Sequence, residues 1–508
     1  MSDQIFIVIV AVFQIQCVLN NKSVPLNDYL ELKSRFLFAN NITADDHFET
    51  YYAGIGAHIV LTDPNEMTMN AQLMSYKDKE IDSGLSDPNR FYASQSFFKS
   101  KIHIDESKVF ELIRKLPKGA SLHSHSTALV SINYIFNNLT YRDNLFVKQN
   151  SNDKTFILKF FKNAPGWPWR AIQEMRLKHP EFNSQLKRQM TLALSTSRDN
   201  KNAIWTRFEA IFTFLRPLLT FYPVFKDYFF QVLEEHYNDN IRYMEIRSGL
   251  PELYDLDGRF YDHEATLDVM YGVVNDFMTT HSNFVGVKII FSPNRRTNLT
   301  ILATYIGFLK KMNRKYPDFL AGFDLVGQED AGPPLKSMLP ILLEIRKNFK
   351  LFLHAGETLW NGVETDENLI DAIFLNSSRI GHGYALVKHP RLLKMVKDKD
   401  IALEICPISN QILGLVNDFR NHPLNFLIAN NYSVVLCSDD PSFWGATGVS
   451  YDWYVTFMAM TSRHADLRLL KQLAINSIKY SALTQSEKIK FMKQWFIDWN
   501  QFINNYFP

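Results

Sequence analysis

The sequence predicts an α/β protein of the (β/α)₈-barrel (TIM-barrel) class. From residue 115 onward, short apolar runs rich in β-branched and aromatic residues alternate with stretches of helical periodicity. Near-continuous apolar strands are typical of a parallel sheet that is buried on both faces, and eight such strands close a barrel. The eight runs are ASLHSH (120–125), IRYMEIRS (241–248), VGVKIIFS (285–292), LAGFDLVG (320–327), KLFLHAGE (350–357), SRIGHGYA (378–385), IALEICPIS (401–409) and YSVVLCSDD (432–440).

The polar residues of these runs fall mostly at the C-terminal end of each run. They are His123, His125, Glu245, Arg247, Asp324, His354, Glu357, His382, Glu404, Asp439 and Asp440. Catalytic residues of this architecture gather at the carboxyl ends of the strands. We therefore expect one active site at that end of the barrel.

Two segments outside the regular barrel pattern are expected to form structure of their own. Residues 20–114 mix apolar and charged residues and read as an N-terminal helical region before the barrel of 115–508. Residues 126–240 separate the first two strands by far more than a crossover helix needs, which predicts an inserted subdomain over 140–195. Its aromatic content argues against the alternative of a disordered loop.

The C-terminal stretch 464–507 has helical periodicity and is expected on the barrel exterior.

Residues 1–19 are interpreted as a signal peptide. The apolar run Ile5–Phe13 is too short to span a bilayer and fits the hydrophobic region of such a peptide. Asp3 and the absence of Lys or Arg before the run are atypical, and a buried N-terminal strand is the alternative. Six N-x-S/T sequons are compatible with secretion. They begin at Asn21, Asn41, Asn138, Asn298, Asn376 and Asn431.

Composition excludes some classes of partner. Hydrophobic residues make up 46% and charged residues 21% of the chain, an ordinary globular balance. The net charge of +2 does not favour nucleic acid or an anionic membrane, and no membrane-spanning segment is expected. Of the three cysteines, Cys17 would leave with the signal peptide, while Cys406 and Cys437 lie in apolar runs as buried thiols. No disulfide framework is implied.

Four strand-end residues suit a zinc ion: His123, His125, His354 and Asp439. The two histidines of H-x-H point the same way on a strand because side chains alternate between faces. Three imidazoles and one carboxylate leave a position for water, whose pKa zinc lowers to about 7. The sequence therefore predicts a hydrolytic zinc site.

Three further residues are acid–base candidates. Glu357 follows His354 by three residues, where the strand turns into a loop. His382, flanked by glycines, could be a fifth ligand, a general base or a core histidine. Asp440 follows the proposed ligand Asp439, and its alternative role is a helix N-cap before Pro441.

These motifs resemble a known family. MEIR, GFDLVG, HAGET, RIGHG, EICPISN and SDDP, preceded by PKGASLHSH, are similar to the adenosine deaminase superfamily of metal hydrolases. The chain most closely resembles the secreted adenosine deaminase growth factor family, from about residue 57 to near the C-terminus, including WTRFEAIF (205–212).

The resemblance implies an extracellular hydrolase that converts adenosine, or 2′-deoxyadenosine, to inosine and ammonia. One zinc per subunit would be held by His123, His125, His354 and Asp439. Glu357 would give a proton to N1 of the purine, and His382 would act as the base for the attacking water. Substrate contacts would come from Asp440 at N7, the Gly327 backbone, Trp205, Glu209 and Phe212. The family also implies growth-factor action through adenosine removal, a homodimer formed by residues 20–114, and an insertion that binds a cell-surface receptor or glycosaminoglycan.

Two residues depart from the family pattern. Ser126 stands where relatives carry an Asp that contacts the nucleoside, and Asn294 replaces a pocket histidine. Both changes affect substrate recognition and leave the ligands and proton carriers intact. The alternatives are a growth-factor-like or purine-binding protein with weak or lost activity, or a deaminase of another aminopurine. Cytidine-type zinc deaminases need P-C-x-x-C, which this chain lacks.

Overall fold

The computed structural model describes residues 26–37, 54–150, 155–194 and 201–506. The predicted signal peptide, residues 1–19, lies outside these ranges, as does Cys17. Within the ranges, no helix is both long enough and apolar enough to cross a membrane.

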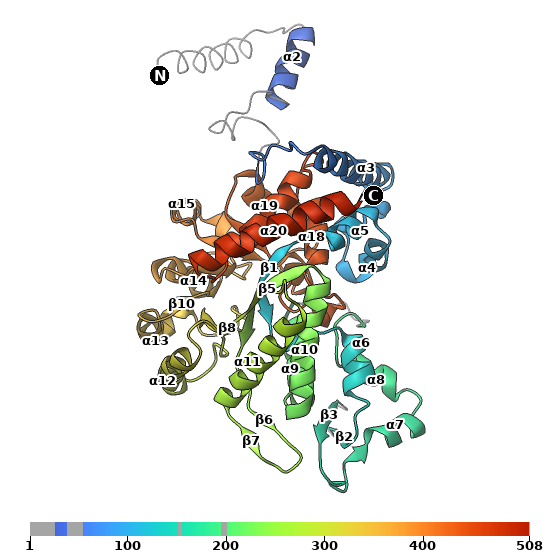
Figure 1. Ribbon diagram of the computed structural model, residues 1–508, viewed down its shortest axis with the longest axis vertical. Helices are drawn as coiled ribbons and strands as arrows, with labels where there is room; N and C mark the ends of the chain where they lie inside the picture. Colours follow the sequence, from blue (N-terminus) through green and yellow to red (C-terminus); the bar gives the residue numbers. More distant parts are fainter. Residues whose placement is uncertain (1–25, 38–53, 151–154, 195–200, 507–508) are drawn as a thin grey trace.

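A parallel barrel occupies the centre of the molecule (Figure 1). One sheet pairs five strands in the order β1 (Gly119–His125), β5 (Ile241–Ser248), β8 (Gly286–Phe291), β9 (Leu320–Phe323) and β10 (Lys350–Leu351). A second sheet pairs β11 (His354–Ala355), β12 (Arg379–His382), β13 (Ala402–Ile405) and β14 (Val434–Leu436). β10 and β11 are two parts of one segment, and a parallel bridge between Ser124 and Asp439 joins the second sheet back to β1. The predicted barrel class is confirmed.

Several strands end earlier than the apolar runs that predicted them. β9, for example, ends at Phe323, where the run continues to Gly327. Oδ1 of Asp324 accepts a hydrogen bond from the backbone N–H of Leu325, so this N–H does not pair with a neighbouring strand. Asp324, Glu357, Asp439 and Asp440 thus lie in loops beyond the strands, whereas the other polar residues at the ends of the runs lie within them.

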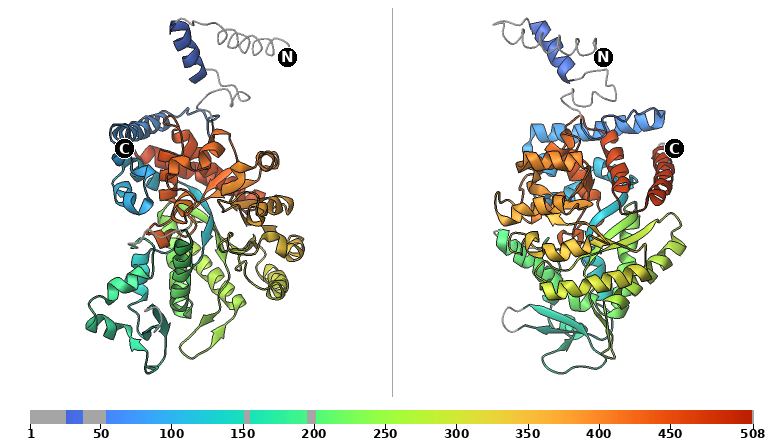
Figure 2. Two further views of the ribbon diagram at one scale, coloured as in Figure 1. Left: turned by 180° about the vertical axis from the view of Figure 1, so that it is seen from behind. Right: turned by 90° about the vertical axis from the view of Figure 1, so that its left-hand side faces the viewer.

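Helices surround the barrel (Figure 2). They are α10 (Tyr222–Asn238), α11 (His263–Thr280), α12 (Leu299–Lys315), α13 (Leu339–Ile345), α14 (Glu364–Phe374), α15 (Pro390–Asp398), α16 (Pro407–Ile412), α17 (Leu424–Ala429), α18 (Ser450–Ala459), α19 (Leu467–Lys479) and α20 (Gln485–Tyr506). α20 buries Trp495 and Trp499 against the body, and the indole of Trp495 donates to the carbonyl of Pro117. The C-terminal stretch is therefore helical, as its periodicity predicts.

The N-terminal region contains α2 (Leu26–Leu37), α3 (Pro64–Ser86), α4 (Phe97–Asp105) and α5 (Lys108–Lys115). α3 is attached to the loop after α18 by Lys77, which is fully buried. Its ammonium donates to the carbonyls of Ser462 and Ala465 at 2.9 and 2.7 Å. These contacts tie the N-terminal helices to the barrel.

The long connection between β1 and β5 is folded in its described parts. It contains α6 (Ile132–Tyr134), β2 (Leu145–Gln149), β3 (Phe156–Phe160), β4 (Arg170–Ala171), α7 (Ile172–Lys178), α8 (Phe182–Arg188) and α9 (Lys201–Leu219). β3, β2 and β4 form an antiparallel sheet. This sheet, with α7 and α8, lies at the opposite end of the molecule from α3 (Figures 1 and 2).

Candidate active site

Four side chains predicted as metal ligands converge at the carboxyl ends of the strands. His123 and His125 point to one face of β1, His354 comes from β11, and Asp439 follows β14. Their potential ligand atoms all lie within 4.8 Å of one another. Oδ1 of Asp439 is 3.3 Å from Nε2 of His123 and 3.0 Å from Nε2 of His125. The sequence pattern thus identified residues that the fold brings together.

Buried carboxylates orient two of these imidazoles. Nδ1 of His123 lies 2.7 Å from Oε2 of Glu404, and Nδ1 of His354 lies 2.6 Å from Oδ2 of Asp324. Each Nδ1–H donates to a carboxylate, which leaves the Nε2 lone pair directed at the centre of the cluster. This pairing is the usual support for a metal-binding histidine.

The donor set fits a divalent metal ion. In the described part of the chain, Nε2 of His123 and Oδ1 of Asp439 are buried without a partner in hydrogen-bond geometry, although they face each other. Burying polar atoms without a partner is costly, so a cation between them would relieve that cost. Three imidazoles with one carboxylate are typical of zinc.

The electrostatics of the cluster favour a bound cation. Burial lowers the pKa of His354 to about 4, which keeps this imidazole neutral. Burial and the Arg247 guanidinium act to lower the pKa of His123. The carboxylates of Asp439 and Glu404 outweigh them and raise this pKa to about 9. Metal binding requires the neutral form of this imidazole, so it would release any proton held on Nε2 of His123.

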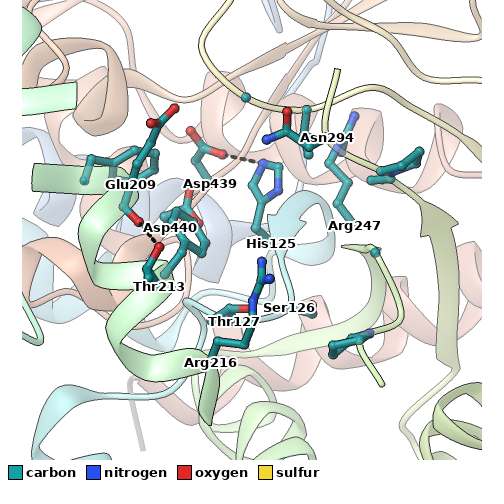
Figure 3. Close-up of a pocket in the computed structure, with 18 of the residues that line it drawn as sticks. His125, Ser126, Thr127, Glu209, Thr213, Arg216, Arg247, Asn294, Asp439 and Asp440 are labelled. Carbon is teal, nitrogen blue, oxygen red and sulfur yellow. Dashed lines mark hydrogen bonds and ion pairs between the residues drawn. The ribbon is translucent and has the colours of Figure 1, made fainter. Parts of the chain in front are cut away.

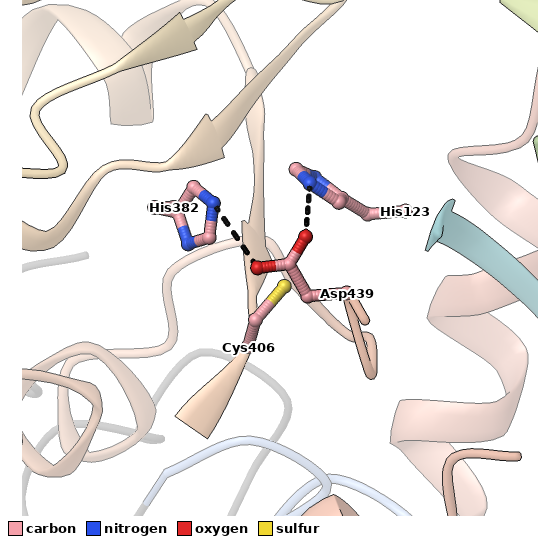
Figure 4. A group of neighbouring side chains, drawn as sticks. All are labelled: His123, His382, Cys406 and Asp439. Carbon is pink, nitrogen blue, oxygen red and sulfur yellow. Dashed lines mark ion pairs between the residues drawn. The ribbon is translucent and has the colours of Figure 1, made fainter. Parts of the chain in front are cut away.

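A second group of potential ligands overlaps the first (Figure 4). It combines His123 and Asp439 with His382 and Cys406. Burial raises the pKa of the Cys406 thiol well above its usual value, which opposes the thiolate that metal binding requires. The first group is therefore the better candidate for a metal site.

Two site residues adopt left-handed backbone conformations. His382 has φ 60° and Asp439 has φ 61°, a region that costs most non-glycine residues about 1–3 kcal/mol. Both residues lie where a strand ends, and the turned backbone directs their side chains into the cluster. Such strain is common at functional sites.

A pocket of about 780 Å³ opens over the cluster (Figure 3). All predicted substrate contacts line it, together with the catalytic candidates and three of the four candidate metal ligands. These residues are Ser126, Trp205, Glu209, Phe212, Asn294, Gly327, Asp440, Glu357, His382, His125, His354 and Asp439. His123 lies below the pocket floor, fully buried.

The wall of the pocket combines aromatic and polar groups. Phe212 of α9 packs edge-on against Phe443 with ring centroids 4.7 Å apart. Oε1 of Glu209 accepts from Arg296 at 3.1 Å across the exposed rim. Gly327 has φ 106°, and a Cβ there would lie 3.1 Å from the Asn294 amide nitrogen, so close approach requires glycine.

Ser126 is held beside the metal cluster. Its hydroxyl donates to the hydroxyl of Ser248 at 3.2 Å, and its backbone N–H donates to the carbonyl of Arg247. The side chain is half-buried at the pocket wall. A longer acidic side chain at this position would reach further into the pocket.

The loop that carries Glu357 is anchored by Glu329. The carboxylate of Glu329 accepts from the backbone N–H groups of Gly356 and Glu357, each at 3.2 Å. Glu357 is buried, and its Oε1 lies 3.7 Å from Nε2 of His382. The two acid–base candidates therefore face the same volume.

Asp440 precedes a 3₁₀ turn at Pro441–Trp444 but makes no side-chain capping hydrogen bond. Its carboxyl instead lines the pocket. Burial and the neighbouring Asp439 raise the pKa of Asp440 well above its usual value. These observations favour a role in the pocket over the N-cap alternative.

A buried ion network supports the cluster from below. Arg247 bridges Asp324 and Glu404 at 2.7 and 2.6 Å, and Arg379 bridges Glu404 and Glu245 at 2.6 Å each. The carboxylates that orient the histidines are themselves held by arginines. The side chains are essentially inaccessible to solvent.

Sequence reasoning missed several supporting residues. Asp324 and Glu404 were recognised as strand-end polar residues without a role, while Glu329, Asn410 and Arg379 were not identified. For Asp324, Glu404 and Arg379, a polar residue within a predicted apolar run was an available signal. Their partners, however, come from distant segments that spacing does not reveal.

Together, the barrel and the converging site define a hydrolase of the (β/α)₈-barrel class. The family model described as "Adenosine deaminase" matches residues 183–495, and the model "Adenosine/AMP deaminase N-terminal" matches residues 51–113. The chain belongs to the adenosine deaminase family.

Relatives resemble nearly the whole chain. "Adenosine deaminase" from Phlebotomus duboscqi is 43% identical over 99% of this chain and 98% of its own length. "Adenosine deaminase 2" from Homo sapiens is 40% identical over 88% of this chain and 90% of its own length. A solved amidohydrolase from Burkhoderia ambifaria, with bound Zn, shares the fold at a TM-score of 0.54 and 18% identity. That alignment covers 78% of this chain and 94% of the amidohydrolase.

Proposed function

We propose that the protein is a zinc-dependent deaminase that hydrolyses adenosine to inosine and ammonia. The observation that carries the proposal is the position of the four-residue ligand cluster at the floor of a pocket large enough for a nucleoside. Family membership and the names of the relatives support adenosine as the substrate.

His123, His125, His354 and Asp439 would hold the ion, one per subunit. Zinc at this position would supply Lewis-acid activation of water near neutral pH. Its presence in the solved amidohydrolase of the same fold supports the choice of ion.

The side chains around the ligands would divide the remaining chemistry. Glu357, buried beside His382, would give a proton to N1 of the purine and make C6 electrophilic. Asp440 would hydrogen-bond N7, and the backbone at Gly327 would contact the base. His382, whose Nε2 lies 3.7 Å from Oε1 of Glu357, would act on the attacking water.

The sugar would occupy the part of the pocket lined by Ser126, Glu209 and Asn294. Ser126 offers a neutral hydroxyl, already bonded to Ser248, in the place where the family carries a carboxylate. We infer that ribose recognition is weakened or shifted, which would extend the substrates toward 2′-deoxyadenosine or another aminopurine nucleoside.

The extracellular location, the signal peptide of residues 1–19 and growth-factor action through adenosine removal belong to the same proposal. So do glycosylation at the exposed sequons, the homodimer formed by residues 20–114, and binding of a receptor or glycosaminoglycan by the insertion 140–195. The family resemblance and the six sequons support them.

A nucleoside panel assayed on the zinc-loaded protein tests the proposal. We expect conversion of adenosine to inosine, and its loss in Glu357→Gln with zinc content unchanged. Glu364→Gln, at an exposed carboxylate paired with Lys336, is the matched control and should keep full activity. A protein with stoichiometric zinc and no turnover of any nucleoside would support the purine-binding alternative instead.

A further inference from the structure

We propose that a buried chain of three hydrogen bonds fixes His382 as the tautomer that carries its proton on Nε2. The chain runs from the backbone of Leu424 through His422 and Asn410 to His382. Asn410 and His422 are positioning residues, since neither lines the substrate pocket. His382 then faces the reaction centre as a hydrogen-bond donor.

The first bond has only one possible direction. The backbone N–H of Leu424, at the start of α17, lies 3.0 Å from Nδ1 of His422. A backbone N–H can only donate, so Nδ1 of His422 must carry a lone pair. Burial lowers the pKa of His422 to about 3, so the ring is neutral and its single proton resides on Nε2.

The second bond determines the orientation of the Asn410 amide. Nε2 of His422 lies 3.0 Å from Oδ1 of Asn410. Because this nitrogen donates, its partner must be the amide oxygen. The usual ambiguity between the oxygen and nitrogen of an amide is therefore resolved by its neighbours. The amide NH₂ group must face the other way.

The third bond determines the tautomer. Nδ2 of Asn410 lies 3.2 Å from Nδ1 of His382 and donates to it. Nδ1 of His382 is therefore the acceptor, and the proton of the neutral ring lies on Nε2. That nitrogen is 3.8 Å from Oδ2 of Asp439 and 3.7 Å from Oε1 of Glu357, directed at the cluster.

The chain cannot easily reverse. If His382 donated from Nδ1, the amide would turn and His422 would need a proton on Nδ1, directly against the N–H of Leu424. A backbone N–H in a folded chain cannot rotate to avoid it. His382, Asn410 and His422 are 1%, 1% and 2% exposed, which leaves bulk water little access to replace a partner in the chain.

The consequence for the reaction rests on the proposed function. In this tautomer, Nε2–H of His382 donates to the oxygen of the attacking water and so orients the water molecule. The same N–H stabilises negative charge as it develops on that oxygen. The resemblance assigns His382 as the base. The hydrogen-bond chain instead gives the resting enzyme a donor at that position.

Neutron diffraction of the deuterium-exchanged, zinc-loaded protein tests the proposal directly. We expect deuterium on Nε2 of both His382 and His422, and none on Nδ1 of either ring. Deuterium on Nδ1 of His382 would overturn the assignment. This readout does not depend on turnover: a wild-type protein without deaminase activity would refute the proposed function and leave the tautomer result standing.

A variant gives an independent test. In Asn410→Asp, both side-chain oxygens accept, so His382 must donate from Nδ1 and the tautomer reverses. We expect kcat to fall about 10- to 100-fold, the range seen when outer partners of site histidines are lost, with KM unchanged. Nitrogen-15 spectra of histidine-labelled protein should report the switched tautomer. Asn430→Asp, at a half-buried position directly after α17 and away from the pocket, is the control. Wild-type kcat and an unswitched spectrum in Asn410→Asp would contradict the proposal.

Discussion

Nδ1 of His354 lies 2.6 Å from Oδ2 of Asp324, and the same carboxylate oxygen accepts from Nε of Arg247 at 2.7 Å. The other oxygen of Asp324 accepts from the backbone N–H of His354 at 2.9 Å. One buried side chain therefore fixes both the ring and the backbone of a metal-ligand candidate. The candidate metal site therefore depends on a carboxylate that is not itself one of the proposed ligands.

Weakening this support should weaken metal binding. In Asp324→Asn, the amide keeps the shape but loses the negative charge that orients and polarises the His354 ring. We expect zinc affinity to fall about 10- to 100-fold, measured by competition with a chromophoric chelator. Asp398→Asn, at an exposed residue paired with Lys394, should bind zinc like the wild type. Equal affinity in the two variants would show that Asp324 does not support the ligand.

Restoring a carboxylate in the pocket should strengthen adenosine binding. Ser126→Asp places an acceptor beside the predicted sugar position, and a hydrogen bond to a charged group contributes about 1.5–3 kcal/mol. We expect KM for adenosine to fall by about tenfold or more, measured by steady-state kinetics. Ser126→Ala, which removes only the hydroxyl, should not lower KM. An unchanged or higher KM in Ser126→Asp would show that Ser126 is not a missing sugar contact.

Breaking the ion network below the site should destabilise the fold. Arg379→Met leaves the buried carboxylates of Glu245 and Glu404 without this partner. We expect the free energy of unfolding to fall by about 3–5 kcal/mol in urea titrations. Arg420→Met, which breaks an exposed pair with Asp418, should cost under about 1 kcal/mol. A loss in Arg379→Met no larger than in the control would contradict this account of the network.

The barrel, and the convergence of the candidate ligands, could be predicted because each depends on local pattern. Eight apolar runs mark the strands, and polar residues at their ends mark the site. Because the carboxyl ends of parallel strands meet at one end of a barrel, His123 and Asp439 are expected to lie close together from local sequence pattern alone. The run ending at Gly327 shows the limit, since the hydrogen bond from the Leu325 N–H to the Asp324 side chain, directly after β9, cannot be read from the hydrophobic pattern.

The supporting contacts were beyond sequence reasoning for a different reason. Asn410 touches His382, 28 residues away, and His422, 12 residues away, across separate elements. Neither pair has a diagnostic spacing, and amide–imidazole contacts occur in many cores. The same holds for Lys77, which a helical pattern places on α3 but does not show to be fully buried.

Lys77 should give the protein a pH-dependent stability. Burial lowers its pKa from 10.5 to about 7, while the unfolded chain keeps the ordinary value. Between these two values the unfolded state binds more protons, so Lys77 makes stability rise with pH across this window. Relative to that of Lys77→Met, the free energy of unfolding of the wild type should rise by up to about 1.4 kcal/mol per pH unit above pH 7. The measurement is a set of urea titrations from pH 7 to 9. A difference in unfolding free energy between the two proteins that stays constant over this range would contradict the prediction.

The most direct test of the central claim is a zinc titration of the metal-depleted protein with adenosine as substrate. We predict no inosine formation without metal and a linear rise in activity that ends at one zinc per subunit. We further predict that His354→Ala abolishes both stoichiometric zinc binding and turnover. Full deamination by the metal-free protein, or one bound zinc per subunit with no conversion of adenosine, would contradict the account.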